Sequence, residues 1–441
     1  MVLRLIEGED ASWQGLWEGR LAAQEEAARQ VRSIVEAVRS QGQVAVFAYT
    51  RELDRVSLTE ETFRVKPEEI EAAYKEVEPG LLAAIRRARA NIIEYHRRQV
   101  DNSWITTDEA GNVLGQLCRP LRRVGIYIPG GSAAYPSSVL MTALPAKVAG
   151  VKEVALATPP RPDGSVHPLV LVAARECGIE EIYKMGGAQA VAALAYGTEL
   201  VPRVDKIVGP GNLYVTLAKK EVYGRVDIDM LAGPSEIVVV ADATARPDWV
   251  AADLLSQAEH DPLAGAVLVT PVRDLAQAVI AEVEGQLSNL PRQAIAARSL
   301  ENYGAVILVE DMYKALEVVN GLAPEHLELY VADPWRWLGM VTNAGAIFLG
   351  PYSPEPLGDY LAGPSHVLPT GSTARFYSPL NVDTFLKKSS LIAYSREGLI
   401  KAARDVEKLA EAEGLTAHAR AVVLRREELE GSNAGGRDGG S

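Results

Sequence analysis

The chain contains few of the residues from which several common functional sites are built. Its 441 residues include two cysteines, Cys118 and Cys177, and six histidines. Two isolated thiols exclude a disulfide framework and a zinc site of paired thiolates, and they are typical of a reducing cytosol. Neither a G-x-G-x-x-G dinucleotide fingerprint nor an H-E-x-x-H metalloprotease motif occurs in the sequence.

Long apolar runs are also missing. No stretch approaches the length needed to span a bilayer, and acidic residues occupy the N-terminal region where a signal peptide requires an apolar run. The formal net charge of −13 argues against nucleic acid or an anionic membrane as the main partner. We therefore expect a soluble intracellular protein, and a small cationic substrate would suit its negative charge.

From residue 122 onward, short apolar runs alternate with helical patterns, as is typical of parallel strands in βαβ units. The runs form two series: residues 124–128, 154–157, 182–183 and 206–208, and then residues 237–240, 266–269, 305–308 and 346–349. They predict two α/β domains joined near residues 230–234. Periodicity predicts helices over residues 12–40, 66–99 and 397–413, and no strand is expected after Pro379.

Gln257 and His260 lie three residues apart near the end of a predicted helix that begins at Pro247 and stops before Pro262. That spacing places two side chains on one helix face, which an apolar stripe continues inward. Their oxygen and nitrogen donors suit zinc. A buried histidine hydrogen-bonded at a helix C-terminus is the alternative for the same pattern.

Four further polar residues are candidates for catalysis or metal binding. Glu325 and His326 are adjacent and point in different directions, so they are able to act on two different protons; an incidental pair on a surface loop is the alternative. Asp359 lies in a loop rich in glycine and proline, where it offers a carboxylate to a metal or forms a cap or turn. His418 follows a helix that ends at a glycine, and a capping role is its alternative.

Glycine-containing loops follow three of the predicted strands, at residues 129–131, 186–187 and 209–212. Open α/β sheets bind ligands at such strand ends, and a loop that precedes a helix presents N–H groups to phosphate. Glycines that serve only packing are the alternative for these loops.

Taken together, these segments resemble the histidinol dehydrogenase family in order and wording. The resemblance covers nearly the whole chain except the last dozen residues, and Ser365 is a departure because asparagine is commoner there. The matching segments are VGIYIPGG at 124–131, GGAQA at 186–190, GPGN at 209–212, AGPSEI at 232–237, QAEHD at 257–261, PEHL at 324–327, GDYLAGPSHVLPT at 358–370 and EGLTAH at 413–418.

The resemblance implies an α/β fold with two incomplete Rossmann-like parallel-sheet domains plus small helical N- and C-terminal segments. Residues 31–120 and 235–380 would form the first α/β domain, which carries most of the zinc and catalytic site, and residues 121–234 the second, which binds NAD. The other implied parts are an N-terminal helical arm (1–30), a C-terminal segment exchanged in a homodimer (381–430) and a disordered tail (431–441).

The implied activity is oxidation of L-histidinol to L-histidine through bound L-histidinal, with two successive hydride transfers to NAD. His326 would take the alcohol proton, and Glu325 would activate the water that attacks the aldehyde. One zinc per active site is expected, on Gln257, His260, Asp359 and His418.

Further residues match family positions around the substrate and the cofactor, and in the homodimer Glu413 and His418 would complete the partner's site. The implied substrate contacts are Ser235, Gln257, His260, His326, Asp359, His366, Glu413 and His418. The implied NAD contacts are Tyr127, Gln189 and Asn212.

Other functions remain as alternatives. Relatives of the family oxidise other small alcohols, such as diols or sulfonated alcohols, and specificity changes with few pocket residues. A zinc hydrolase would use Glu325 to activate metal-bound water directly. A non-catalytic scaffold would not explain why the sequence contains the whole set of Gln257, His260, Glu325, His326, Asp359 and His418. Reduction of NAD on addition of substrate separates the dehydrogenases from the other two.

Overall fold

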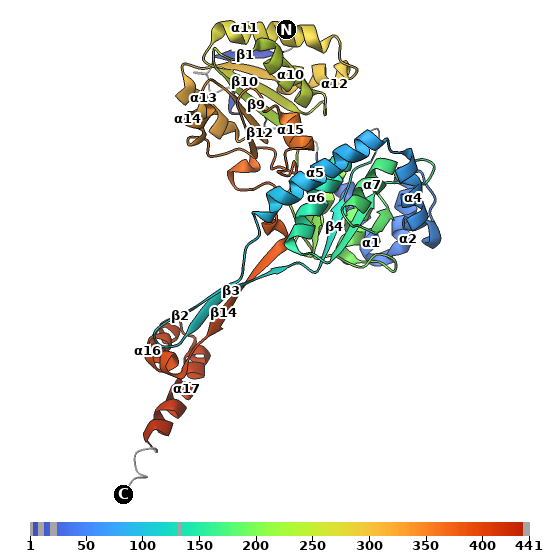
Figure 1. The fold of residues 1–441 in the computed structure, drawn as a ribbon. Coiled ribbons are helices and arrows are strands. Elements are labelled where there is room, and N and C mark those ends of the chain that lie inside the picture. Colours follow the sequence, from blue (N-terminus) through green and yellow to red (C-terminus); the bar gives the residue numbers. More distant parts are fainter. Residues whose placement is uncertain (1–2, 8–12, 18–23, 131–133, 435–441) are drawn as a thin grey trace. The chain divides into compact units, whose positions relative to one another are not determined.

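The computed structural model describes residues 3–7, 13–17, 24–130 and 134–434. They divide into two compact units (Figure 1). The first unit comprises residues 1–100 and 121–385, and the second comprises residues 101–120 and 386–441. None of the helices within the described ranges combines the length and the apolar character that crossing a bilayer requires.

The first unit contains a five-stranded parallel sheet with the order β6-β5-β4-β7-β8. The chain starts in the middle of this sheet, builds one side and then returns to build the other, as in Rossmann-like sheets. Four of its strands confirm the first predicted series. The strands are β4 (Arg123–Tyr127), β5 (Glu153–Thr158), β6 (Glu181–Lys184), β7 (Lys206–Val208) and β8 (Asp227–Ile228).

A six-stranded parallel sheet with the order β1-β11-β10-β9-β12-β13 forms the other half of the first unit. Its later strands confirm the second predicted series. The predicted N-terminal helical arm is wrong for residues 4–7, which form an edge strand. The strands are β1 (Arg4–Glu7), β9 (Glu236–Ala241), β10 (Gly265–Thr270), β11 (Ala305–Leu308), β12 (His326–Tyr330) and β13 (Ala346–Leu349).

The central strands of both sheets are buried on both faces, which explains why they read as continuous apolar runs. In β9, Ile237 and Val239 pack into one hydrophobic core, whereas Val238 and Val240 pack into another on the opposite face. This alternation follows from the two-residue period of a strand. Burial of one such side chain stabilises the folded state by about 1.5–3 kcal/mol.

Helices from residues 24–97 cover the five-stranded sheet, together with the helices between its strands. Val31 and Val35 of α1 share a core with Val191, and Ile92 of α5 shares another with Val139. The helices of this half are α1 (Gln24–Gln41), α2 (Gln43–Tyr49), the π-helix η2 (Thr50–Asp54), α3 (Glu60–Phe63), α4 (Pro67–Glu76), α5 (Pro79–Arg97), α6 (Pro136–Ala149), α7 (Pro168–Glu176), α8 (Gly187–Tyr196) and α9 (Leu213–Val222).

These contacts correct the predicted division, which joined residues 31–120 to residues 235–380. The described residues from 31 to 97 belong with the five-stranded sheet, and residues 101–120 belong to the second unit. The six-stranded sheet has its own helices: α10 (Pro247–Ala258), α11 (Arg273–Leu287), α12 (Gln293–Tyr303), α13 (Met312–Leu322), α14 (Pro334–Leu338) and α15 (Glu355–Tyr360). Short 3-10 helices η3 (Thr373–Arg375) and η4 (Asp383–Phe385) follow.

The second unit contains an antiparallel three-stranded sheet, β14-β3-β2, and a pair of packed helices. Its strands are β2 (Trp104–Thr107), β3 (Val113–Pro120) and β14 (Leu386–Ala393), and its helices are α16 (Arg396–Ala412) and α17 (Thr416–Ala434). The helix predicted at 397–413 is confirmed, but β14 shows that the expected end of strands at Pro379 is wrong. The predicted disordered tail begins inside α17, and residues 435–441 lie outside the described residues.

Candidate active site

Glu325 and His326 lie where β12 begins, beside β9 in the middle of the six-stranded sheet. The exposed fractions of these two residues are 5% and 3%. Glu325 Oε2 accepts the backbone N–H of Glu236 at 2.9 Å, and Ser235 hydrogen-bonds to the same carboxyl. The site therefore lies at the amino ends of its strands, whereas open α/β sheets usually bind ligands at the carboxyl ends.

The hydrogen bond of His326 defines its neutral tautomer. Nδ1 lies 3.0 Å from the carbonyl oxygen of Glu236. Because a carbonyl only accepts, Nδ1 carries a proton and the ring's lone pair is on Nε2. Nε2 is buried and has no hydrogen-bond partner among the described residues. Glu325 Oε2 lies 3.7 Å from Nδ1, beyond hydrogen-bond distance, so the two side chains do not simply pair.

Two carboxyl groups from α15 face the free nitrogen of His326. Glu355 Oε1 lies 3.9 Å from Nε2, and Asp359 Oδ1 lies 3.8 Å from it. The ligand atoms of the three residues lie within 4.8 Å of one another, an arrangement that could hold a metal ion. Glu355 is not among the site residues predicted from the sequence. Its spacing of four from Asp359, which puts both on one helix face, was the available signal.

The pKa values in this cluster differ from their ordinary values. Burial raises the pKa of Glu325. Burial acts to lower the pKa of His326, but the surrounding carboxylates, led by Glu325, outweigh it and raise the pKa to about 10. Burial and then the charge of Asp359 raise the pKa of Glu355 to about 8. At Asp359, burial acts to raise the pKa. Hydrogen bonding and the charges of the nearby imidazoles outweigh burial and lower the pKa. Asp359 is therefore ionised at neutral pH.

Glu328 holds the start of α15 in place. It lies two residues after His326 on β12, and its Oε1 accepts the backbone N–H of Glu355 at 2.8 Å. Burial and then the charge of Asp253 raise the pKa of Glu328 well above its ordinary value. The buried Glu328 carboxyl thus fixes the first residue of the helix that carries Asp359.

Gln257 and His260 lie in different local environments. Gln257 lies in α10 with 1% of its surface exposed, and its Oε1 has no hydrogen-bond partner among the described residues. α10 ends at Ala258, so His260 lies in the following turn and is exposed. The prediction of a shared inward helix face is therefore wrong for His260. Gln257, His260 and Asp359 nevertheless offer an amide oxygen, an imidazole and a carboxylate, which are donor types that suit zinc.

His366 is anchored at both ring nitrogens. Nδ1 lies 3.0 Å from the carbonyl oxygen of Asp359, and Nε2 lies 3.1 Å from the hydroxyl of Ser138 in α6. Ser365, the position of the departure noted above, donates its hydroxyl to the carbonyl of Met141. The imidazole of His366 is therefore fixed next to Asp359, and burial lowers its pKa.

The predicted NAD contacts lie at the carboxyl ends of the strands of the five-stranded sheet. Tyr127 ends β4, and its hydroxyl accepts the N–H of Gly187 at 3.1 Å. Gln189 donates from Nε2 to Asp54 at 3.2 Å, and its buried Oε1 has no hydrogen-bond partner among the described residues. Asn212 follows β7 and caps α9. This edge is the one at which Rossmann-like sheets bind dinucleotides.

Glu413 and His418 belong to the second unit. Glu413 is the residue after the end of α16, and His418 lies in the first turn of α17. Both are exposed. The remaining predicted site residues belong to the first unit.

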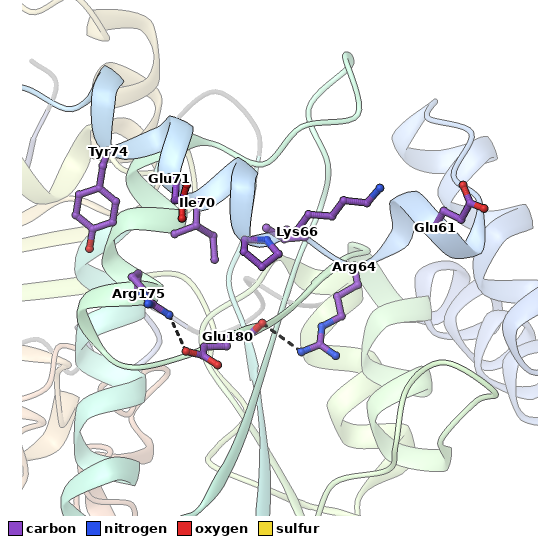
Figure 2. A pocket seen from close by; sticks show the side chains of 10 residues that line it. Glu61, Arg64, Lys66, Ile70, Glu71, Tyr74, Arg175 and Glu180 are labelled. Carbon is purple, nitrogen blue, oxygen red and sulfur yellow. Dashed lines mark hydrogen bonds and ion pairs between the residues drawn. The ribbon is translucent and has the colours of Figure 1, made fainter.

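A separate groove of about 610 Å³ is lined by charged residues of the half around the five-stranded sheet (Figure 2). Arg175 Nη1 donates to Glu180 Oε1 at 2.6 Å, and Arg64 Nη2 donates to the Glu180 carbonyl at 3.4 Å. Arg175 and Glu180 thus form an ion pair, and the groove contains none of the predicted site residues.

Two Rossmann-like parallel sheets, a loop edge suited to a dinucleotide and a buried carboxyl–histidine cluster define an α/β enzyme of the dehydrogenase class. The family model described as histidinol dehydrogenase matches residues 19–426. The chain belongs to the histidinol dehydrogenase family, and it is therefore an oxidoreductase.

Similar proteins cover nearly the whole chain. A histidinol dehydrogenase of Moorella thermoacetica is 68% identical over 426 residues, which are 97% of this chain and 100% of the relative. One from Heliobacterium mobile is 61% identical over 90% of this chain and 93% of the relative. The crystal structure of histidinol dehydrogenase from Elizabethkingia anophelis matches with a TM-score of 0.93 and 39% identity, over 97% of this chain and 99% of that chain.

Proposed function

We propose that the protein oxidises L-histidinol to L-histidine through bound L-histidinal, with two successive hydride transfers to NAD, as the last step of histidine biosynthesis. The observation that carries the proposal is the buried pair Glu325 and His326, with Nε2 of His326 free of hydrogen bonds in a cluster of carboxyl groups. The names of the relatives support this substrate. Overall, the alcohol, one water and two NAD give the carboxylate, two NADH and three protons.

The two catalytic residues have separate tasks. His326 Nε2 accepts the proton of the substrate hydroxyl in the first oxidation and of the aldehyde hydrate in the second. Glu325, held by the N–H of Glu236, takes a proton from the water that attacks the aldehyde. NAD, when bound, supplies the hydride acceptor for both steps.

We assign one zinc per active site to Gln257, His260, Asp359 and His418. The unpartnered Oε1 of Gln257 and the ionised Asp359 support this set. When bound, the metal would orient the imidazole and amine of the substrate, and its charge would oppose protonation of His326. The alternative set of His326, Glu355 and Asp359 would occupy the nitrogen that the base requires.

Further residues would bind the substrate and the cofactor. Ser235 and Glu413 are assigned to the amine or ring nitrogens of the substrate, and His366 is assigned to its forming carboxylate. Tyr127, Gln189 and Asn212 are assigned to NAD, which the free Oε1 of Gln189 at the carboxyl edge of the sheet supports.

The first test of the function compares alcohols. We expect NADH to form from NAD with L-histidinol, and far more slowly with a small diol or a sulfonated alcohol at equal concentration. The absorbance of NADH measures each rate. Activity with the other alcohols alone would assign the chain a different substrate. Absence of NADH with every alcohol, together with hydrolysis of an ester or amide, would favour a zinc hydrolase.

We further propose that the protein is a homodimer in which Glu413 and His418 complete the partner's site. Exposed apolar side chains on the second unit support an interface of this kind. They include Trp104, Ile105, Ile392, Tyr394 and Leu409.

We also propose that the protein is located in the cytoplasm, a reducing compartment, which the free thiols of Cys118 and Cys177 support.

Mixed dimers test this exchange. A His326→Asn chain combined with a His418→Ala chain is expected to regain activity, because one of the two sites would then receive wild-type residues from both chains. Two different affinity tags isolate the mixed dimer for assay. A matched control combines His326→Asn with Glu325→Gln, both in the first unit, and should not regain the formation of L-histidine from L-histidinol, because neither site then contains both wild-type residues. An inactive first mixture would contradict the exchange.

A further inference from the structure

A buried ion pair lies beneath the loop of residues 209–212 in the first unit. Lys219 in α9 pairs with Asp229, the residue that follows β8. Their side chains are 3% and 1% exposed. Neither residue belongs to the site set described above, and their charges call for an explanation because burial of an ion pair is costly.

Both members of the pair bind the same backbone residue. Asp229 Oδ2 accepts the N–H of Gly209 at 2.7 Å, and Lys219 Nζ donates to the carbonyl of Gly209 at 3.0 Å. Gly209 has a φ of +114°, and a Cβ on it would lie 2.1 Å from the carbonyl oxygen of Tyr127. The pair therefore fixes a residue that only glycine fits and whose backbone touches β4 at Tyr127.

This arrangement is more specific than stability requires. Apolar residues of similar volume often replace a buried ion pair with no loss of stability or with a gain. They provide neither an acceptor for an N–H group nor a donor for a carbonyl. An apolar pair would therefore not hold the backbone of Gly209 in place. Gly209 begins the loop that ends at Asn212.

We propose that Lys219 and Asp229 are positioning residues for the dinucleotide: they fix the loop of residues 209–212 against Tyr127 without touching the cofactor. The inference rests on the proposed function, in which Tyr127 and Asn212 contact NAD. It adds two residues from α9 and the end of β8 to the machinery of the cofactor site.

The test replaces the pair in the full-length protein by Lys219→Met with Asp229→Leu. We expect the double variant to fold with a lower free energy of unfolding, because the buried N–H and carbonyl of Gly209 lose their partners. We expect the KM for NAD to rise about 10- to 100-fold and the KM for L-histidinol to stay the same. Chemical unfolding and initial rates measure these quantities. A folded double variant with a wild-type KM for NAD would overturn the inference.

Two matched variants separate position from packing and charge. Lys219→Gln with Asp229→Asn keeps one donor and one acceptor for Gly209, so it should restore most of the affinity for NAD; a KM as high as that of the apolar pair would overturn the inference. Arg123→Met with Glu181→Leu removes another largely buried ion pair, at the opposite ends of the strands, and should leave the KM for NAD unchanged.

Binding of NAD to the wild-type protein, measured by calorimetry without alcohol, keeps the two claims apart. No binding by the wild type would contradict the proposed function itself. Binding that is equal in the wild type and the apolar variant would contradict only the role of Lys219 and Asp229.

Discussion

Replacement of His326 by asparagine is expected to lower kcat for both L-histidinol and L-histidinal by about 10²- to 10⁴-fold, the range that a positioned general base contributes. Asparagine keeps an N–H group for the carbonyl of Glu236, which His326 binds at 3.0 Å, but offers no base at the position of Nε2. Both oxidation steps need that base, so both should slow. Steady-state rates with each substrate measure the effect.

The zinc content of the same variant distinguishes the two possible ligand sets. If Gln257, His260, Asp359 and His418 hold the metal, the His326→Asn protein should retain zinc after dialysis as the wild type does. If His326, Glu355 and Asp359 hold it, the variant should lose zinc. Normal turnover would contradict the role of His326 as the base, and loss of zinc would contradict our ligand assignment.

Replacement of Glu325 by glutamine is expected to slow the oxidation of L-histidinal by about 10²- to 10⁴-fold and the oxidation of L-histidinol much less. Glutamine keeps an oxygen for the N–H of Glu236, so the fold around the site should be preserved. Only the aldehyde step needs activated water, and an amide cannot accept its proton. Single-turnover experiments with each substrate and excess NAD separate the two rates.

Equal slowing of both steps by Glu325→Gln would contradict the assignment of water activation to this residue. It would favour instead a role of the Glu325 charge in holding His326, whose pKa it helps to raise. A Glu328→Gln variant serves as a control. It keeps an oxygen for the N–H of Glu355 beside the site, and it should affect the two steps alike.

The sequence predicts the central strands well because burial on both faces leaves continuous apolar runs. Val238 and Val240 face one core and Ile237 and Val239 the other, so each position must be apolar. β14 has no such signal, since most of its side chains are exposed and its pairing partner, β3, lies far away in the sequence. The edge strand β1 is only four residues long.

The grouping of helices could not be read from the sequence. The apolar faces of α1 and α5 predict burial but do not say which sheet they cover. That choice depends on shape complementarity with residues such as Val191 and Val139, which are distant in the chain. The predicted domain boundaries consequently placed residues 31–120 with the wrong sheet.

The candidate site was predicted in part. Glu325 and His326 are adjacent in the sequence and are therefore close together in the structure, where β12 begins at His326. Glu355 was missed, since its burial depends on Glu328 and His326, which are brought to it only by the packing of α15 on β12. His260 was misplaced because helix α10 ends earlier than the proline at 262 indicates.

The proposed reaction is a four-electron oxidation that depends on a bound metal ion. The most direct measurement is the number of NADH molecules formed per L-histidinol consumed, with NAD in excess, before chelation, after chelation and after zinc is restored. We predict two NADH per L-histidinol, loss of activity with the chelator and recovery with zinc. One NADH per L-histidinol with accumulation of the aldehyde, or undiminished activity in protein shown to be free of metal, would contradict the account.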